Sequence, residues 1–188
     1  CPDPDDPYMQ ENPTRIIIKT EEASTTFGLY LSGNGYIWID WGDESWERFQ
    51  LSNSRELYQH SYETGRQYEI EIYGQENLPN QIISFGPGDS ANNPYNKYIE
   101  EIVTWGDLRL VSLSGALSYT EGPLKVPNEL PETITDLSFM LQNSQVEEVI
   151  NLESWDVSRV TNMSWTFTRA TSFDQDIRGW NTKNVENM

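Results

Sequence analysis

The sequence predicts a mainly β protein in which a small antiparallel β-sandwich precedes a short solenoid. The first observation is that residues 14–75 contain six short stretches rich in β-branched and aromatic residues, separated by glycine, asparagine and serine. The second is that apolar residues between 98 and 188 return every 24 to 26 residues, a period typical of solenoid proteins. This span suits about three and a half coils.

Residues 1–13 are predicted to form a flexible acidic tether, because the side chains of CPDPDDPYMQENP do not collapse onto a core. The chain begins with Cys1, its one cysteine, and has no initiator methionine. A cysteine in this place, followed by a tether with early acids, resembles a mature bacterial surface lipoprotein. The resemblance implies that Cys1 carries lipid and anchors the protein at the outer membrane, on the cell surface. The alternative is that Cys1 only marks the boundary of a segment.

Residues 14–75 are predicted to form the sandwich. The expected strands cover residues 14–20, 25–31, 36–41, 46–50, 56–62 and 66–73. The sequence Ser32-Gly33-Asn34-Gly35 predicts a tight turn, because glycine and asparagine readily adopt the positive φ that such turns need. Within residues 36–41, alternate side chains point to opposite faces, and both faces carry large apolar rings.

The sandwich segment also carries a motif. Asp40-Trp41-Gly42-Asp43 is followed by HSYETGRQYEIEIYG, which begins at His60. This combination resembles PKD-like domains (polycystic kidney disease type), whose pattern contains D-W-G-D-G and then H-x-Y. Glu44 stands where these domains usually have glycine, which leaves the type of turn after Asp43 open. The resemblance implies structural roles: the aspartate caps a turn, and the histidine and tyrosine tie adjacent strands.

The solenoid is predicted over residues 76–188, with 76–97 as a connecting and capping segment. This segment is rich in proline, glycine and asparagine, but QIISF at 81–85 is too apolar for a free linker. We therefore expect it to cap the first coil against the sandwich. The proline-rich stretch 118–133 is expected to bulge from one side.

The repeat is clearest in the last third of the chain. Two spaced pairs return 25 residues later: Leu152-x-x-Trp155 as Ile177-x-x-Trp180, and Val160-x-x-Met163 as Val185-x-x-Met188. An amphipathic helix is the alternative, since apolar residues also recur at i, i+3 and i+7. An amphipathic helix does not account for tryptophans that recur at the same position of each repeat. The pattern therefore favours coils whose apolar residues stack on each other.

The segments ESWDVSRVTNMSWTF and FDQDIRGWNTKNVENM resemble the repeat of the BspA-like leucine-rich-repeat surface proteins of bacteria. Two units match this pattern, and the match weakens upstream of about residue 140. The resemblance implies short strands that run parallel from coil to coil, with a helical turn near Phe167. It also places Trp155, Trp180, Met163 and Phe167 in the core, and it implies adhesion or recognition as the function.

The final residues, from Asn184 to Met188, copy the start of a repeat that then breaks off. A terminal coil normally needs a polar cap, and these residues keep the apolar pattern of internal coils. We therefore expect further repeats in the natural gene, or a partner chain that covers the open end of the solenoid.

Composition excludes several functions. The formal net charge is −18, from 30 acidic and 12 basic residues, so binding to nucleic acid is not expected. One histidine and one cysteine do not suffice for a histidine–cysteine metal cluster, and no calcium-loop motif is present in the sequence. We expect neither a metal nor a cofactor.

The candidate ligand-binding residues are three aromatics that do not fall on the core phases, namely Trp46, Tyr119 and Trp165. Exposed aromatic rings anchor protein interfaces and stack on sugars. The acid pairs read as solvated residues or turn caps, and His60 has no recognisable nucleophile partner. We therefore predict a non-enzymatic cell-surface protein that recognises a host or matrix protein. The alternatives are a glycan-binding surface lipoprotein of a polysaccharide uptake system and, third, a glycoside hydrolase.

Overall fold

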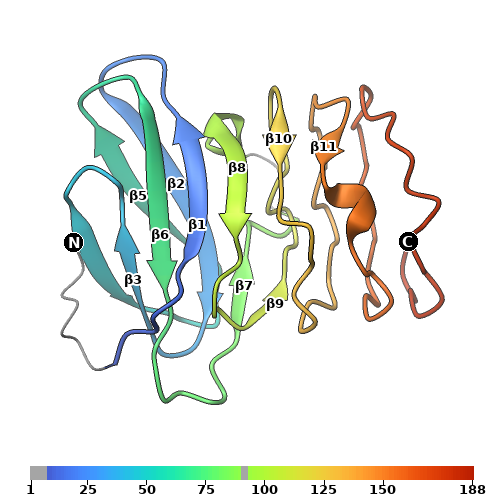
Figure 1. The fold of residues 1–188 in the computed structure, drawn as a ribbon, viewed down its shortest axis with the longest axis horizontal. Coiled ribbons are helices and arrows are strands. Elements are labelled where there is room, and N and C mark those ends of the chain that lie inside the picture. Colours follow the sequence, from blue (N-terminus) through green and yellow to red (C-terminus); the bar gives the residue numbers. More distant parts are fainter. Residues whose placement is uncertain (1–7, 90–92) are drawn as a thin grey trace.

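The computed structural model describes residues 8–89 and 93–188, and in these the chain is mainly β, as predicted (Figure 1). The strands are β1 (Thr14–Lys19), β2 (Thr25–Gly33), β3 (Tyr36–Asp40), β4 (Trp46–Gln50), β5 (Glu56–Tyr62), β6 (Gln67–Tyr73), β7 (Ile83–Phe85), β8 (Ile99–Thr104), β9 (Leu110–Ser112), β10 (Leu124–Lys125) and β11 (Val149–Ile150). Two short 3₁₀ helices, η1 (Asn96–Tyr98) and η2 (Leu152–Ser154), complete the regular structure of the described residues.

The first six strands lie where the sequence predicts them, within two residues at each end. Their side chains alternate between buried and exposed positions, most regularly in β1 and β6. β1 pairs antiparallel with β6, and Ile16 of β1 lies opposite Ile70 of β6. Both isoleucines are fully buried, so the apolar face of this pair turns inward.

The strands form two open, mixed sheets. One sheet has seven strands in the order β11-β10-β8-β1-β6-β3-β4, and the other has four in the order β5-β2-β7-β9. Strands from residues 14–75 and from residues 76–188 therefore share both sheets. Buried side chains of both sheets belong to one hydrophobic cluster that continues into the C-terminal half of the chain.

β8 is the junction between two kinds of pairing. It pairs antiparallel with β1, with two shifts of register, and parallel with β10, which in turn pairs parallel with β11. β7 has the same role in the other sheet, because it is antiparallel to β2 and parallel to β9. The apolar segment 81–85 thus forms part of a sheet that both halves of the chain build.

Beyond β8, successive turns of the chain lie side by side along the long axis of the molecule (Figure 1). Parallel bridges join Ser112 to Asp136, Asp136 to Asn162, and Asn162 to Asn187. Backbone bonds connect the same neighbours, and Leu137 N–H donates to Asn162 O at 2.9 Å. Side chains extend this ladder: Ser112 Oγ donates to Asp136 Oδ2 at 2.9 Å, and Asn162 Nδ2 donates to Asp136 Oδ1 at 3.0 Å.

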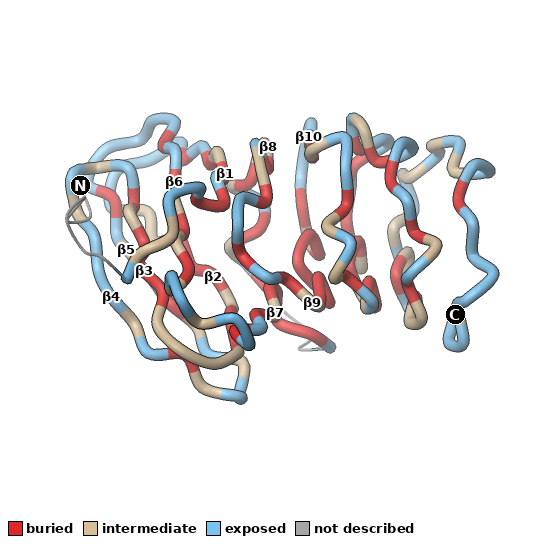
Figure 2. The backbone as a smooth tube through the Cα atoms, turned by 60° about the horizontal axis from the view of Figure 1, so that its bottom comes forward, coloured by how far each residue is buried: buried red, intermediate tan, exposed pale blue. Residues whose placement is uncertain are grey.

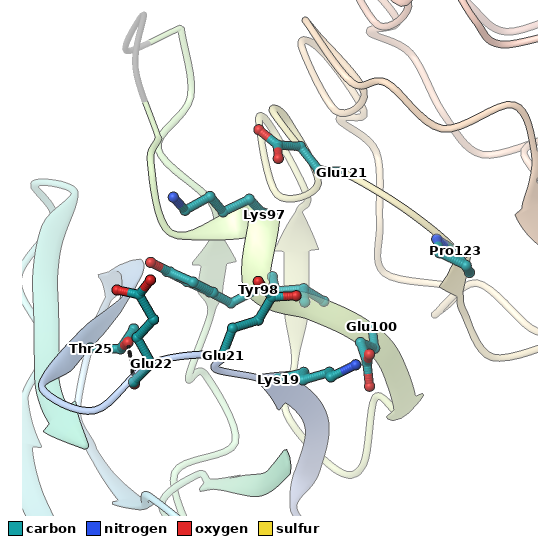
Figure 3. A pocket seen from close by; sticks show the side chains of 10 residues that line it. Lys19, Glu21, Glu22, Thr25, Lys97, Tyr98, Glu100, Glu121 and Pro123 are labelled. Carbon is teal, nitrogen blue, oxygen red and sulfur yellow. Dashed lines mark hydrogen bonds between the residues drawn. The ribbon is translucent and has the colours of Figure 1, made fainter. Parts of the chain in front are cut away.

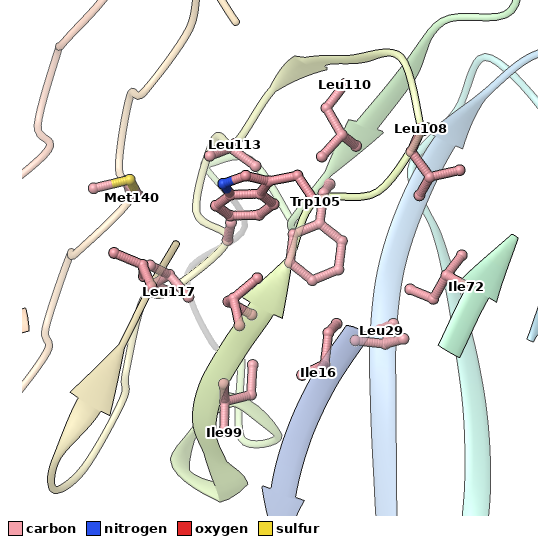
Figure 4. Packing of buried hydrophobic residues seen from close by; sticks show 14 of the residues in the cluster. Ile16, Leu29, Ile72, Ile99, Trp105, Leu108, Leu110, Leu113, Leu117 and Met140 are labelled. Carbon is pink, nitrogen blue, oxygen red and sulfur yellow. The ribbon is translucent and has the colours of Figure 1, made fainter. Parts of the chain in front are cut away.

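The tryptophans predicted in the core are buried. Trp155 is 3% exposed and Trp180 is 8% exposed. Each ring also bonds to a neighbouring turn, because Trp155 Nε1 donates to Pro127 O at 2.8 Å and Trp180 Nε1 donates to Leu152 O at 3.2 Å. Figure 4 shows the ring of Trp105 packed among leucines where the sheets meet the repeated turns. Met163 is buried as well, whereas Phe167 is only partly buried.

The predicted tether covers residues 1–13, and its last six residues lie against the fold. Gln10 N–H donates to Gly74 O at 2.9 Å, and Asp107 N–H donates to Asn12 O at 2.9 Å. Met9 forms an isolated bridge with Gln75. Cys1, the predicted site of lipid attachment, lies outside the described residues.

Burial is continuous from the sheets into the repeated turns and decreases in the last turn, which is mostly exposed (Figure 2). Val185 of that turn packs partly against the cluster, while the side chain of Met188 is 83% exposed. Among the described residues, no helix has the length and apolar character needed to cross a membrane.

Candidate binding surface on the repeated turns

Two aromatic rings form a stacked pair on neighbouring turns, in which Trp165 is exposed and Phe139 is half-buried. Trp165 is 61% exposed, and its ring lies parallel to that of Phe139, with an interplanar angle of 1° and centroids 6.4 Å apart. This distance is within the range of offset stacking. The remaining tryptophans are buried, except Trp46 at 39% exposed, so Trp165 offers more indole surface to solvent than any other residue of its type.

The two residues of this pair share an unusual backbone conformation. Phe139 has φ 56° and Trp165 has φ 61°, which places both in the left-handed region. Each residue occupies the same corner of its turn, and Phe139 N–H donates to Ser164 O of the next turn at 3.0 Å. A bulky side chain in this conformation is unfavourable by about 1–2 kcal/mol. Local preference therefore does not account for the aromatic residues at this corner.

The equivalent corner of the preceding turn contains Gly115, with φ 72°. A Cβ atom there would lie 2.5 Å from Gly88 O, so the backbone of residues 86–88 leaves no room for a side chain. At the next two turns this obstruction is absent, and the corner carries Phe139 and then Trp165. We call Phe139 and Trp165 the aromatic row.

A second row runs beside the first, four residues further along each turn. It consists of Tyr119, Asn143 and Arg169, with φ of 60°, 55° and 56°. The turns are held in register by backbone bonds from Tyr119 N–H to Gln142 O and from Asn143 N–H to Thr168 O, both 2.9 Å long. Tyr119 is half-buried, and Arg169 is exposed. We call these three residues the polar row.

The structure brings two of the three predicted site residues onto one surface. Trp165 belongs to the aromatic row and Tyr119 to the polar row. Trp46 lies on β4, the edge strand at the opposite end of the molecule from the C-terminus, and its backbone pairs with Asp40 of β3 (Figure 2). It therefore does not contribute to the surface that Trp165 forms.

Phe139 is the residue that sequence reasoning missed. It follows Leu137 by two positions, just as Trp165 follows Met163, and its phase in the repeat was therefore available from the sequence. The apolar core residues define the repeat, whereas the corner position between them holds a different residue in each turn, namely Gly115, Phe139 and Trp165. A position that changes from turn to turn gives no periodic signal.

Exposed acids follow the polar row in each turn. They are Glu121 in the first turn, Glu147 and Glu148 in the second, and Asp174 in the third. Asp174 N–H donates to Glu147 O at 2.9 Å, so these positions are stacked neighbours. We call these four residues the acidic column. None of them forms an ion pair with another residue of the described chain.

His60 belongs to a different cluster, with Asp43 and Ser45 in the turn between β3 and β4. Asp43 Oδ2 lies 2.7 Å and Ser45 Oγ 3.3 Å from the same ring nitrogen, Nε2. In a Ser-His-Asp triad the two partners bind opposite ring nitrogens, so this arrangement does not activate the serine. Burial raises the pKa of Asp43, but hydrogen bonds from Ser45 and His60 outweigh it and keep this pKa below its usual value.

The cluster instead ties strands together. The His60 ring stacks on Trp41 with centroids 5.3 Å apart, and Tyr62 Oη donates to Trp41 O at 2.8 Å. Gly42 N–H donates to Asp40 Oδ1 at 2.9 Å, which caps the turn. Glu44 has φ 74°, and this left-handed conformation explains why glycine suits that position.

A charged hollow of about 490 Å³ lies between the β1–β2 loop and the turn that contains η1 (Figure 3). Side chains of both signs line it, among them Lys19, Glu22, Lys97 and Glu121. Lys97 Nζ lies 5.0 Å from the centroid of the Tyr98 ring. Within the described chain, no group of three histidine, cysteine, aspartate or glutamate side chains is placed to hold a metal ion.

A sequence profile of one protein family, described as a Mycoplasma protein of unknown function, DUF285, matches residues 125–188. The matched stretch includes the aromatic row and the last two residues of the polar row. No curated protein and no solved structure matches the chain.

Proposed function

We propose that this protein is a non-enzymatic recognition protein of the bacterial cell surface, which binds a host or matrix protein through the aromatic and polar rows. The observation that carries the proposal is the exposed indole of Trp165, stacked on the half-buried Phe139, with both residues in a backbone conformation that is unfavourable for bulky side chains. Residues in strained conformations are concentrated at functional sites, where selection for binding outweighs the loss of stability. Selection for binding to a partner would explain why aromatic residues occupy these two positions, which selection for stability alone does not.

The composition of the two rows supports a protein partner. Protein interfaces are enriched in tryptophan, tyrosine, phenylalanine and arginine. Tryptophan, tyrosine and arginine are the commonest among the residues that contribute most to affinity. The rows carry Trp165, Phe139, Tyr119 and Arg169, with Asn143 as an adaptable hydrogen-bonding side chain. They lie on a stack of hydrogen-bonded turns, a rigid support that limits the entropy lost on binding.

The finer architecture is part of the proposal. We propose that residues 76–188 form a BspA-like leucine-rich-repeat solenoid, supported by parallel bridges at repeat spacing and by the DUF285 match. We also propose that residues 14–75 are a PKD-like sandwich whose sheets are extended by strands of the solenoid. The cluster of Trp41, Asp43, His60 and Tyr62 supports this assignment.

The proposal includes an anchor. A lipid on Cys1 would hold the molecule at the outer membrane surface by its N-terminal end. If so, Cys1→Ser in the natural precursor should leave the protein unprocessed and absent from the membrane fraction. A single acyl chain binds membranes only marginally, so stable anchoring should require more than one. A Cys1→Ser variant that still partitions into membranes would contradict this part.

The test of recognition is binding of the whole chain to an array of extracellular-matrix proteins. Trp165→Ala should weaken the interaction about tenfold or more, as expected when a central interface residue is lost. Trp46→Ala is the matched control, because it removes an exposed tryptophan from the opposite end of the molecule and should leave binding unchanged. Equal affinities for wild type and Trp165→Ala on every ligand would refute the proposal.

Recognition of a glycan is the second candidate. The observation that favours it is the outward indole of Trp165, because aromatic rings form platforms on which sugars stack. A glycan array incubated in parallel distinguishes the two candidates. Trp165-dependent binding to oligosaccharides, without binding to any matrix protein, would select the glycan.

A further inference from the structure

We infer that the partner is a cationic, lysine- and arginine-rich protein segment that lies across the aromatic row and against the acidic column. The inference rests on the proposed function and adds the chemical class of the partner. Three observations on different residues support it: acids that follow the polar row in successive turns and form no ion pair in the described chain, an exposed indole that no cation of the described chain covers, and the charge of the whole chain.

The acidic column is electrostatically unfavourable in the isolated molecule. Glu147 and Asp174 occupy stacked positions joined by a backbone bond, and Glu148 adds a third carboxylate. Like charges at neighbouring positions destabilise a folded chain. Within the described residues no lysine or arginine compensates them by an ion pair, whereas Asp176 nearby is paired with Arg178. A cationic partner would supply the missing compensation.

Trp165 offers a face that attracts cations. The charged groups of lysine and arginine are attracted to the faces of aromatic rings, and tryptophan attracts them more strongly than tyrosine or phenylalanine does. The fold already uses this contact within itself: Arg48 lies 4.9 Å from the centroid of Tyr36, and Arg66 lies 4.6 Å from that of Tyr68. In the described chain no cation lies over Trp165, so its exposed ring is available to a cation from a partner.

The net charge of −18 decides between a cationic partner and a second copy of this chain. Two copies that met through these rows would repel each other, because each carries the same excess of acids. The same excess attracts a basic partner from a distance and speeds association. Charge complementarity therefore favours the cationic segment.

Arg169 is the cation of the polar row, and the inference predicts the direction in which its removal changes the affinity. It should oppose a cationic partner, so Arg169→Ala should tighten binding. If Arg169 instead paired with a carboxylate of the partner, the same substitution would weaken binding. The direction of this one change distinguishes the two chemistries.

The experiment uses residues 1–188 and a fluorescent decapeptide of alternating lysine and arginine, followed by fluorescence anisotropy. Glu147→Gln with Glu148→Gln should weaken binding about fivefold or more, which corresponds to about 1 kcal/mol or more for the two lost charge contacts together. Glu44→Gln with Glu47→Gln is the matched control, because it removes the same charge from exposed residues at the β4 end of the molecule, far from the acidic column, and should change the affinity less than about twofold. Circular dichroism confirms that each variant is folded.

On the same peptide, Trp165→Ala should weaken binding about threefold to tenfold, since a partly desolvated cation–π contact contributes about 1 kcal/mol. Trp46→Ala should have no effect, and Arg169→Ala should increase the affinity. A decaglutamate peptide should not bind.

Three results would overturn the inference. Equal effects of the two glutamate pairs would mean that the peptide responds only to total charge. Weaker binding by Arg169→Ala would indicate a partner that carries carboxylates. Trp165-dependent binding to oligosaccharides or to uncharged matrix proteins, with none to the cationic peptide, would reject the cationic partner but leave the proposed recognition surface intact. The proposed recognition function itself would be refuted only if Trp165→Ala left the affinity unchanged for every ligand tested.

Discussion

At the scale of single residues, Gln175 closes the edge of the seven-stranded sheet with its side chain. Val149 N–H donates to Gln175 Oε1 at 2.9 Å, and Gln175 Nε2 donates to Val149 O at 3.1 Å. The carboxamide thus bonds β11 as the peptide group of a further strand would. Exposed edge groups promote pairing with other chains, so this contact protects the edge of the sheet.

Removing that carboxamide should be costly. Gln175→Ala leaves the N–H and C=O of the fully buried Val149 without their protein partner, which should lower the free energy of unfolding by about 1–3 kcal/mol. Urea titration followed by tryptophan fluorescence measures the change. Gln145→Ala, on an exposed side chain of the preceding turn, is the control and should change stability by less than about 0.5 kcal/mol. Equal stability of the two variants would show that water replaces the carboxamide.

Asp43 gives the stability a dependence on pH. Burial raises its pKa, yet hydrogen bonds from Ser45 and His60 lower it more, so its pKa in the folded state is below the usual 3.8. A carboxyl group with a depressed pKa stabilises the fold above the unfolded value and loses this contribution as the pH falls through the folded value. Asp43→Asn should therefore be less stable than wild type at pH 7, and the difference should shrink below about pH 3.8. A difference that stays constant down to pH 2.5 in thermal melts would contradict this assignment.

At the scale of elements, the strands of residues 14–73 were predictable because their signals are local. Alternating β-branched residues define β1 and β6, and Ser32-Gly33-Asn34-Gly35 marks the β2–β3 turn. The pairing of β1 with β8 was not predictable, since the partners are far apart in sequence and no local pattern encodes which edges meet. The position of Phe139 was encoded by the repeat, but its stacking on Trp165 depends on a backbone conformation that the residue itself disfavours.

The repeated turns depend on their buried tryptophans. Trp155→Ala should lower the free energy of unfolding by about 3–5 kcal/mol, because it opens a cavity and leaves Pro127 O without its donor. Trp165→Ala, which removes an exposed ring from the same repeat, should lower it by about 1 kcal/mol at most. Chemical denaturation of both variants measures the contrast. If Trp155→Ala kept full stability and lost ligand binding instead, the ring would belong to the site and not to the core.

At the scale of the whole molecule, two predicted regions share one framework. β1 has a partner from each region, β6 on one side and β8 on the other, and one hydrophobic cluster runs through both. Neither part buries its sheet edges alone. The chain therefore differs from two modules joined by a linker, even though each half carries its own sequence pattern.

This shared framework predicts a single cooperative transition. Unfolding curves from far-ultraviolet circular dichroism and from tryptophan fluorescence should coincide, because loss of the repeated turns exposes an edge of each sheet. A fragment of residues 8–75 should be unstable, since β1 loses β8 and β2 loses β7. Two separated transitions, or a fragment with the full stability of the chain, would show that the halves fold independently.

The left-handed corners of the repeated turns have an evolutionary consequence. Six such corners carry Gly115, Phe139, Trp165, Tyr119, Asn143 and Arg169, which range from no side chain to aromatic rings, an amide and a guanidinium group. Trp165 and Arg169 are exposed, Phe139, Tyr119 and Asn143 are half-buried, and none of the six belongs to the hydrophobic cluster, so the scaffold accepts different side chains at these corners. Except at Gly115, where a side chain has no room, a gene of this kind can exchange residues at these corners while its folding stays intact. Duplication of one repeat adds a further pair of corners in register with the old ones, so the proposed recognition surface can diversify by copying as well as by substitution.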